Sequence, residues 1–315
     1  MKYPKHLHFT QLNTPLVKLK DHPFGYQLYV KRDDFTGIEL SGNKVRKLDF
    51  LLQEALTKGA KRVITCGGVQ SNHCRATAYM ATKLGLKTTL VLKGEEPENF
   101  ITGNFLLNRI IGADIHFISE TAYQHVDEYM SELAGRYSEK TYVIPEGGSN
   151  ALGAWGYVKA FDEITQQLPE ADAIVAPTGS IGTHAGLLFA RWLKKHPCQI
   201  VSINVCDTAD FFRQKLLHLA LDFKLQFAPQ MTIYEDDIHI VDGFVGTGYG
   251  QVTEREISKI KEVAQKYGFL LDPVYTVKAW MGLEMLLKEG KLPGEKIVFL
   301  HTGGIFGLFA HGNRF

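Results

Sequence analysis

The chain has 315 residues, of which 45% are hydrophobic and 22% are charged, and this composition excludes a disordered or collagen-like protein. The 35 Lys and Arg residues nearly balance the 34 Asp and Glu residues, so the formal net charge is +1. Such a balance gives no electrostatic footprint for nucleic acid or for an anionic membrane, and we expect neither as a partner.

The N-terminal residues, MKYPKHLHFTQLNTPL, contain no apolar core segment, so we expect no signal peptide. Nowhere does the chain approach about 18 uninterrupted apolar residues, so we expect no membrane-spanning helix.

The four cysteines, at positions 66, 74, 198 and 206, form no CxxC pair. So few scattered cysteines predict a reducing, cytoplasmic compartment.

Short β-branched runs alternate along the chain with amphipathic helical stretches. The predicted strands are Gln27–Lys31, Arg62–Cys66, Lys87–Leu92, Asp114–Ile118, Thr141–Ile144, Asp172–Ala176, Gln199–Val205 and Lys296–Leu300. The predicted helices are Lys44–Lys58, Ser71–Leu84, Asn104–Ile111, Tyr123–Tyr137, Leu152–Gln167, Thr183–Lys195, Glu254–Tyr267 and Val277–Lys288. Between Gln214 and Ile240 we expect a helix, a loop and a strand. The alternation predicts an α/β fold with mostly parallel sheets, in which ligands bind beyond the carboxyl ends of the strands.

Three glycine-rich loops follow predicted strands. Their sequences are CGGVQSNHCR (residues 66–75), PTGSIGTHAG (177–186) and HTGGIFG (301–307). Glycines let backbone N–H groups face an anion, and the helix that follows adds the positive end of its dipole. None of the loops matches the common nucleotide motifs. One such loop could be a tight turn and nothing more, whereas three at strand ends favour a phosphate-bearing cofactor, and the second loop is the best phosphate cradle.

Two lysines open the first predicted helix in the segment ELSGNKVRKLDFLL. Lys44 and Lys47 are three residues apart and share one face of that helix. Basic residues are locally unfavourable at the positive end of a helix dipole. The pattern fits a solvated helix face. It also fits a nucleophilic lysine of lowered pKa beside a second lysine that holds an anion, and spacing alone leaves both interpretations open.

Cys66 and Cys74, with His73 between them, raise the question of a metal or redox site. A separation of eight residues across a strand-end loop matches no common zinc spacing. We therefore expect no metal, and we interpret both cysteines as buried small hydrophobic residues.

Five motifs occur in order and at suitable separations: SGNKVRKL, GGVQSNHCRA, PTGSIGTHAGL, LDPVYT and HTGG. Together they resemble the pyridoxal-phosphate enzymes of the tryptophan-synthase-β fold type, and within these the family of D-cysteine desulfhydrases and 1-aminocyclopropane-1-carboxylate (ACC) deaminases. The resemblance runs from about residue 14 to residue 309 and weakens between residues 214 and 240. It implies two three-layer αβα domains with mostly parallel sheets, and pyridoxal 5'-phosphate bound between them. The large cofactor-binding domain would comprise residues 1–47 and 151–315, and the small inserted domain residues 48–150.

The resemblance also assigns residues to the cofactor. Lys44 lies at the position of the lysine that forms a Schiff base with it, and Lys47 where the family contacts the phosphate. Asn72 matches the partner of the ring oxygen, and Thr302 matches a hydroxyl partner of the pyridine nitrogen. The implied cofactor-binding residues are Lys44, Lys47, Asn72, Thr178, Gly179, Ser180, Ile181, Gly182, Thr183 and Thr302.

Further residues are assigned to the substrate, a small amino acid. The implied substrate-binding residues are Ser71, Asn72, His73, Tyr249, Tyr275 and Thr276, and the implied catalytic residues are Lys44, Ser71, Tyr249 and Tyr275. The position of His73 holds Gln in some family members. Either the Schiff-base lysine or the facing serine hydroxyl would move the Cα proton. The family further implies a homodimer.

Two positions separate the reactions within the family. The deaminase pattern has Glu after the tyrosine of DPVY and Leu after the histidine of the last strand, where this chain has Thr276 and Thr302. Hydroxyl residues at both positions favour a D-cysteine desulfhydrase, which forms pyruvate, ammonia and hydrogen sulfide. The alternatives are an ACC deaminase and a non-catalytic protein that binds the cofactor or an amino acid. A non-catalytic relative would be free to lose Lys44, Ser71 and the tyrosines, and none is lost here.

Overall fold

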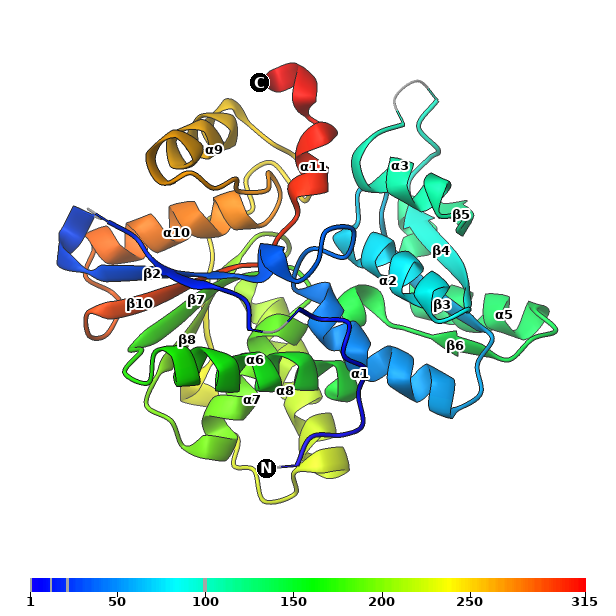
Figure 1. The fold of residues 1–315 in the computed structure, drawn as a ribbon, viewed down its shortest axis with the longest axis horizontal. Coiled ribbons are helices and arrows are strands. Elements are labelled where there is room, and N and C mark those ends of the chain that lie inside the picture. The colour runs from blue at the N-terminus through cyan, green and yellow to red at the C-terminus, as the bar shows by residue number, and fades with distance from the viewer. Residues whose placement is uncertain (1, 12, 21–22, 99–100) are drawn as a thin grey trace.

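The computed structural model describes residues 2–11, 13–20, 23–98 and 101–315. Two β-sheets lie side by side, and helices cover both faces of each (Figure 1). The α/β fold with mostly parallel sheets that the alternating pattern predicts is therefore confirmed.

The larger sheet has six strands in the order β1-β2-β10-β7-β8-β9. The strands are β1 (Leu16–Lys18), β2 (Gln27–Arg32), β7 (Ala173–Thr178), β8 (Gln199–Asn204), β9 (His239–Val241) and β10 (Lys296–His301). Only the edge pair β1–β2 is antiparallel. Every residue of β7 is buried, because helices cover both faces of this central parallel strand. This burial explains why its sequence begins with an uninterrupted apolar run.

The smaller sheet is wholly parallel and has the order β5-β4-β3-β6. Its strands are β3 (Arg62–Gly68), β4 (Lys87–Lys93), β5 (Asp114–Ile118) and β6 (Thr141–Val143). All four come from the part of the chain between β2 and β7, as an inserted unit would. The exact domain boundaries, after residues 47 and 150, stay a prediction.

The helices fill the space around both sheets. They are α1 (Lys44–Thr57), α2 (Asn72–Lys83), α3 (Gly103–Ile110), α4 (Glu120–Tyr123), α5 (Val126–Arg136), α6 (Ala151–Gln167), α7 (Gly182–Lys194), α8 (Ala209–Phe227), α9 (Glu254–Tyr267), α10 (Thr276–Lys288) and α11 (Ile305–Phe309). Short 3-10 turns occupy Pro23–Gly25, Asp33–Phe35, Glu146–Gly148, Glu235–Asp237 and Gly312–Arg314.

The side-chain alternation of β7 and β10 decides which helices lie on which face of the larger sheet. Ile174 of β7 and Val298 of β10 pack into the core formed with α6, α7 and α8. Their neighbours Val175 and Phe299 point the other way, into the core formed with α9 and α10. Because successive strand residues face opposite sides, one continuous apolar strand supplies both cores.

The predicted strands are all present, and the segment between residues 214 and 240 is a helix, a loop and a strand as expected. The helix predicted over Tyr123–Tyr137 is present as α5, but it begins three residues later than predicted, at Val126. Ser119 caps the earlier helix α4, and the backbone leaves helical values at His125 before α5 begins. Strand β1 was not predicted, because three half-exposed residues at a sheet edge carry almost no pattern.

A buried ionic network fixes the orientation of α1. The Arg46 guanidinium donates to both carboxylate oxygens of Asp33, at 2.7 and 2.8 Å, and to Glu163 Oε2 at 2.9 Å. Glu163 also pairs with Lys31, and the Tyr157 hydroxyl donates to Asp33 at 2.6 Å. All five side chains are almost fully buried. Arg46 stands between Lys44 and Lys47 in the sequence, so this anchor sets where both lysines point.

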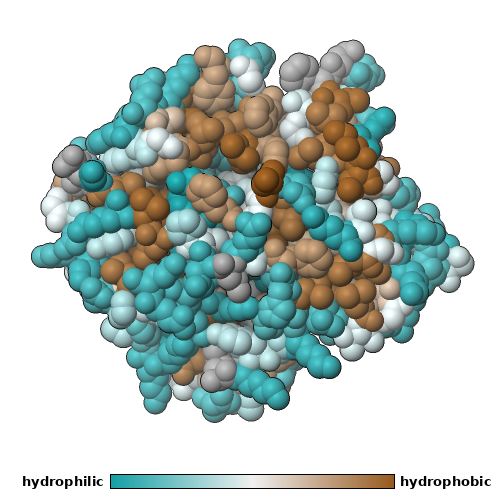
Figure 2. Space-filling view, viewed as in Figure 1, coloured by the Kyte–Doolittle hydropathy of each residue, from teal (hydrophilic) through white to brown (hydrophobic). Residues whose placement is uncertain are grey.

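The surface combines charged areas with local apolar clusters. Figure 2 shows apolar side chains gathered over α3 and beside α11 on the face in view. They include Ile101, Leu106, Ile110 and Phe309, which are 39–67% exposed. Among the described ranges, none of the helices combines the length and apolar character that a bilayer crossing requires.

Candidate active site

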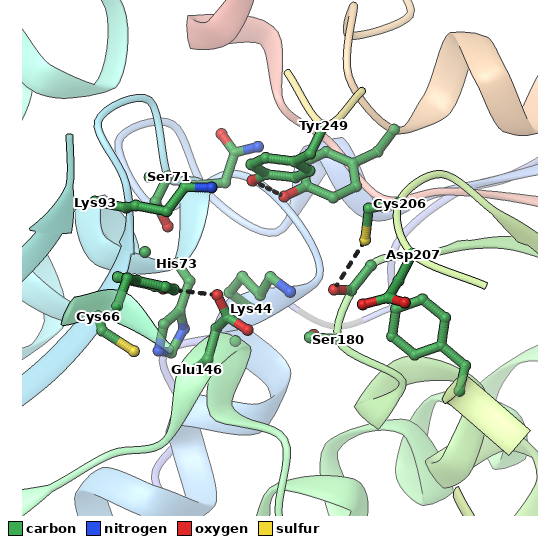
Figure 3. Close-up of a pocket in the computed structure, with 18 of the residues that line it drawn as sticks. Lys44, Cys66, Ser71, His73, Lys93, Glu146, Ser180, Cys206, Asp207 and Tyr249 are labelled. Carbon is green, nitrogen blue, oxygen red and sulfur yellow. Dashed lines mark hydrogen bonds between the residues drawn. The ribbon is translucent and has the colours of Figure 1, made fainter. Parts of the chain in front are cut away.

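A cavity of about 250 Å³ lies between the two sheets, where the carboxyl ends of their strands face each other. A narrower cavity of about 20 Å³ adjoins it and shares Lys44, Asn72, Gly179, Ser180 and Tyr275 with it. The larger cavity also reaches Ser71, His73, Lys93, Tyr123, Glu146, Cys206, Asp207, Lys215 and Tyr249, several of which Figure 3 labels. The narrower cavity also reaches Asn43, Thr178, Ile181, Thr183 and Thr302.

Lys44 is the first residue of α1 and lines both cavities. Burial lowers the pKa of Lys44 to about 8, although the Glu146 carboxylate opposes this effect. A lysine with this pKa has a substantial neutral fraction near neutral pH, which is the form that attacks a carbonyl group. The structure thus favours the nucleophilic interpretation of Lys44 over a solvated helix face.

The loop between β7 and α7 forms a cradle with room for an anion. Ile181 has a left-handed backbone (φ 65°), and Gly182 then begins α7. A Cβ atom at Gly182 would lie 2.5 Å from Ser149 Oγ and 2.8 Å from Lys47 Nζ, so a side chain at this position would have to displace both of these groups. The Thr178 hydroxyl is buried without a hydrogen-bond partner among the described residues. This hydroxyl and the backbone N–H groups at the N-terminus of α7 can donate hydrogen bonds to a phosphate group.

Lys47 supplies the positive charge for this cradle. Its side chain is fully buried, and within the described residues its Nζ donates only to Gly147 O at 3.1 Å and Ser149 Oγ at 3.3 Å. Burial, together with the charges of Lys44 and Lys215, holds the pKa of Lys47 well below its usual value. No carboxylate of the described residues forms an ion pair with Lys47. The positive charges of Lys44 and Lys215 therefore repel that of Lys47 without a paired carboxylate to offset them, and a bound phosphate would supply that negative charge. The residues present thus fit a phosphate-bearing cofactor.

The N-terminus of α2 faces the same cavity. The Ser71 hydroxyl caps this helix by accepting from the Cys74 amide at 3.2 Å. Asn72 Oδ1 accepts from Asn104 Nδ2 at 3.0 Å, which fixes the Asn72 side chain where it reaches both cavities. Unpaired amides at a helix N-terminus attract carboxylates, so this segment can bind the carboxylate of an amino acid.

His73 follows on α2 and is also part of the cavity wall. Burial and the nearby lysines hold its pKa well below the usual value, so the ring is neutral. The Thr65 hydroxyl donates its one proton to Ile144 O at 2.9 Å, so His73 Nε2 must be the donor in the 2.8 Å contact with that hydroxyl. One ring nitrogen of His73 is thereby committed to Thr65 and not to a ligand.

Two tyrosines cover the cavity from the larger sheet. The hydroxyls of Tyr249 and Tyr275 are hydrogen bonded to each other, and both rings line the cavity (Figure 3). The next residue, Thr276, was expected to bind the substrate but does not line either cavity. Thr276 is fully buried outside the cavity walls, and its hydroxyl donates to Asp272 Oδ1 at 2.7 Å. The structure therefore does not bring Thr276 to the site, whereas Thr302 borders the narrow cavity beside Lys44.

Sequence reasoning missed several residues of the wall. The most informative is Glu146, which comes from the loop IPEGGSN and accepts from the Tyr123 hydroxyl at 2.7 Å. Gly147 and Gly148 both have left-handed backbones here. This is a fourth glycine-rich loop after a predicted strand, so the signal that revealed the other three could also have found it.

The cysteines are consistent with structural packing. Cys66 and Cys74 are fully buried and unpaired, and burial raises the pKa of Cys74 to about 12. A thiol with this pKa is not ionised at neutral pH and is neither a ready nucleophile nor a ready metal ligand. Over the described part of the chain, no group of three or more His, Cys, Asp or Glu side chains could hold a metal ion.

Comparison with known proteins agrees with this geometry. Residues 8–303 match the family of pyridoxal-phosphate dependent enzymes. A mitochondrial bifunctional D-cysteine desulfhydrase/1-aminocyclopropane-1-carboxylate deaminase of Arabidopsis thaliana is 41% identical over 319 residues, which cover 95% of this chain and 78% of the plant protein. A D-cysteine desulfhydrase of Salmonella typhimurium is 38% identical over 324 residues, covering 98% of this chain and 97% of the bacterial protein.

A solved structure is similar over almost the whole fold. The crystal structure of an ACC deaminase homologue has a TM-score of 0.90 and 37% sequence identity, and the match covers 99% of this chain and 95% of that one. The phosphate cradle, the lysine of lowered pKa and these matches lead to one conclusion: the chain belongs to the family of pyridoxal-phosphate dependent enzymes.

Proposed function

We propose that this enzyme is a D-cysteine desulfhydrase, which converts D-cysteine and water to pyruvate, ammonia and hydrogen sulfide. The observation that carries the proposal is Thr302. Thr302 lines the narrow cavity together with Lys44, at the position where the desulfhydrase pattern has a hydroxyl residue and the deaminase pattern has Leu. The Salmonella relative of that name, which matches nearly the whole chain, supports it.

The cofactor contacts follow from the cavity walls. Lys47 and the loop Thr178–Thr183 would hold the phosphate, Asn72 the ring oxygen and Thr302 the pyridine nitrogen. When bound, pyridoxal phosphate supplies an electron sink for the negative charge that develops at Cα. The fit of the cradle to a phosphate supports these assignments.

The remaining wall residues would act on the substrate. The N-terminus of α2, with Ser71 and Asn72, would bind the carboxylate, and the paired tyrosines would close the site over it. The Lys44 amine would then take the Cα proton. Ser71, which lines the same cavity, is the other candidate for this step.

ACC deaminase is the second candidate, since the Arabidopsis relative and the solved structure carry that name. Of the two positions that distinguish the reactions, only Thr302 still argues against an ACC deaminase. Thr276 lies outside the cavity walls, so the residue type at this position could affect turnover of ACC only indirectly, through its hydrogen bond to Asp272. Thr276→Glu would place a second carboxylate beside buried Asp272, so we base the test on Thr302 alone.

We expect the unmodified enzyme to prefer D-cysteine over ACC by about a hundredfold in kcat/KM, which corresponds to about 3 kcal/mol. Thr302→Leu should lower D-cysteine turnover by about tenfold, because the pyridine nitrogen loses its hydroxyl partner. The matched control Thr302→Ser keeps the hydroxyl and should retain most activity. Pyruvate release and α-ketobutyrate release measure the two reactions. A preference for ACC would refute the proposed substrate, and release of neither acid would favour the non-catalytic alternative.

The phosphate cradle is tested by Gly182→Asp. The new side chain would collide with Ser149 and Lys47, and its charge would repel the phosphate. We expect the dissociation constant of pyridoxal phosphate to rise by at least about tenfold, measured by titrating the cofactor-free protein. Gly135→Asp on α5 is the control, since a side chain at Gly135 meets nothing within 4 Å. Equal cofactor affinity in both variants would contradict the assignment of this loop.

The homodimer and the cytoplasmic location stay predictions from the family resemblance and from the cysteine pattern. The apolar side chains that gather over α3 and α11 are compatible with a subunit contact.

A further inference from the structure

Glu146 places a carboxylate in the substrate cavity (Figure 3). Its loop passes close to Lys44, because a Cβ atom on the neighbouring Gly147 would lie 3.3 Å from Lys44 Nζ. The Tyr123 hydroxyl donates to Glu146 Oε1 at 2.7 Å and so fixes the orientation of the carboxylate. The pKa of Tyr123 is raised by burial and by the nearby Cys66 and Glu146, so this phenol remains a donor. Within the described residues, Oε2 of Glu146 accepts no hydrogen bond and is free to take one from a ligand.

The charges around Glu146 change when the enzyme is loaded. Lys44 lies beside the Glu146 loop, but its amine would serve the cofactor and the Cα proton and is therefore not a fixed counter-charge for Glu146. Lys93, across the cavity, pairs with Glu120 at 3.3 Å. The α-amino group of a substrate would be held by the cofactor and would not be available to pair with Glu146. Lys215 also lines the cavity, but among the described residues Glu146 forms no ion pair with any of these lysines. A half-buried carboxylate without such a pair favours a ligand that carries a second positive charge.

On the basis of the proposed elimination of a β-substituent, we propose that Glu146 also admits D-amino acids with a positively charged β-substituent, of which D-2,3-diaminopropionate is the smallest. Glu146 accepts a hydrogen bond from the β-ammonium group and keeps that group protonated. The protonated group is the form that leaves as neutral ammonia.

The reaction balances with water as the only co-reactant. The Cα–H bond breaks and its proton passes to the Lys44 amine. The Cα–Cβ double bond forms as the Cβ–N bond breaks, and the electron pair of that bond leaves with ammonia. The released 2-aminoacrylate takes up water and yields pyruvate and a second ammonia. D-2,3-diaminopropionate and water thus give pyruvate and two molecules of ammonia.

The test compares three substrates on the cofactor-loaded enzyme by pyruvate release. These are D-2,3-diaminopropionate, D-cysteine and β-chloro-D-alanine, the last of which carries a neutral β-substituent that leaves as chloride. We expect the unmodified enzyme to turn over all three. Glu146→Gln should lower kcat/KM for D-2,3-diaminopropionate by about tenfold or more relative to each of the other two substrates. The carboxylate also raises the pKa of Lys44, so any change through that lysine should fall on all three substrates alike. The same variant should weaken binding of D-2,3-diaminopropionate, followed through the visible absorption of the cofactor, by a similar factor.

Asp207→Asn is the matched control, because Asp207 is a second carboxylate of the cavity on the opposite wall (Figure 3). Asn tolerates the left-handed backbone that Asp207 adopts (φ 58°), so this variant should fold. It should change all substrates alike and leave their ratio unaltered. Tyr123→Phe, which frees the carboxylate but keeps its charge, should raise KM for D-2,3-diaminopropionate alone.

The outcomes separate this inference from the proposed function. Turnover of D-cysteine without turnover of D-2,3-diaminopropionate overturns the inference and leaves the desulfhydrase standing. An equal loss on all substrates in Glu146→Gln, or a changed ratio in Asp207→Asn, overturns the role of Glu146. Absence of pyruvate from every substrate overturns both proposals.

Discussion

Lys44→Ala should abolish steady release of pyruvate and remove the visible absorption band of the bound cofactor. Lys44 is the only lysine of the described residues that lines both cavities, and burial has already lowered its pKa to about 8. Loss of its proton transfer alone should cost roughly 10²–10⁴-fold in kcat. The covalent attachment to the cofactor is lost as well, so residual turnover should fall below detection in a pyruvate assay.

The matched variant is Lys47→Ala, which removes a buried lysine one helical turn away. Lys47 faces the phosphate cradle through Gly147 and Ser149. Its loss should weaken cofactor affinity, yet an excess of pyridoxal phosphate should restore both the absorption band and activity. If the band instead survives in Lys44→Ala and disappears irreversibly in Lys47→Ala, the two lysines have been assigned the wrong way round.

Local pattern predicted the elements of this fold well because parallel strands have a distinctive composition. The run of β7 is buried on both faces and reads as continuous apolar sequence, and each glycine-rich loop follows such a strand. The exceptions lack this cue. The short edge strand β1 pairs antiparallel and is half exposed, and the break between α4 and α5 depends on a cap at Ser119 and on the backbone of His125.

The site was predictable only as far as motifs reach. The motifs placed Lys44, Asn72, the loop Thr178–Thr183 and both tyrosines at one cavity, and the structure brings them together there. Thr276 is adjacent to Tyr275 in the sequence, but α10 begins between them, and its hydroxyl turns to Asp272. The tertiary packing of α10 decides which of its first side chains face the cavity. The position of Thr276 next to Tyr275 in the sequence therefore could not predict that Thr276 points away from it.

The second large effect is expected in the buried network that holds α1. Glu163→Leu would leave Lys31 and Arg46 without the carboxylate that pairs with each of them at 0–3% exposure. Arg46 would keep Asp33, whereas the Lys31 amine would keep only the Thr14 carbonyl and Gln167. Removing one partner from a buried ion pair usually costs about 3–5 kcal/mol, because the remaining charge stays desolvated. We expect a loss of that size in the free energy of unfolding, measured in urea at a fixed cofactor concentration.

The control is Glu262→Ala, which removes an exposed partner of Lys259 and should cost about 1 kcal/mol or less. Adding Lys31→Met to Glu163→Leu removes the stranded cation, so the double variant should regain part of the lost stability instead of losing more. An additive loss, or a cost for Glu163→Leu no larger than that of the surface control, would show that the network does not depend on charge pairing. Because Arg46 lies between Lys44 and Lys47, a weakened anchor should also lower cofactor affinity, and the double variant should recover the two properties together.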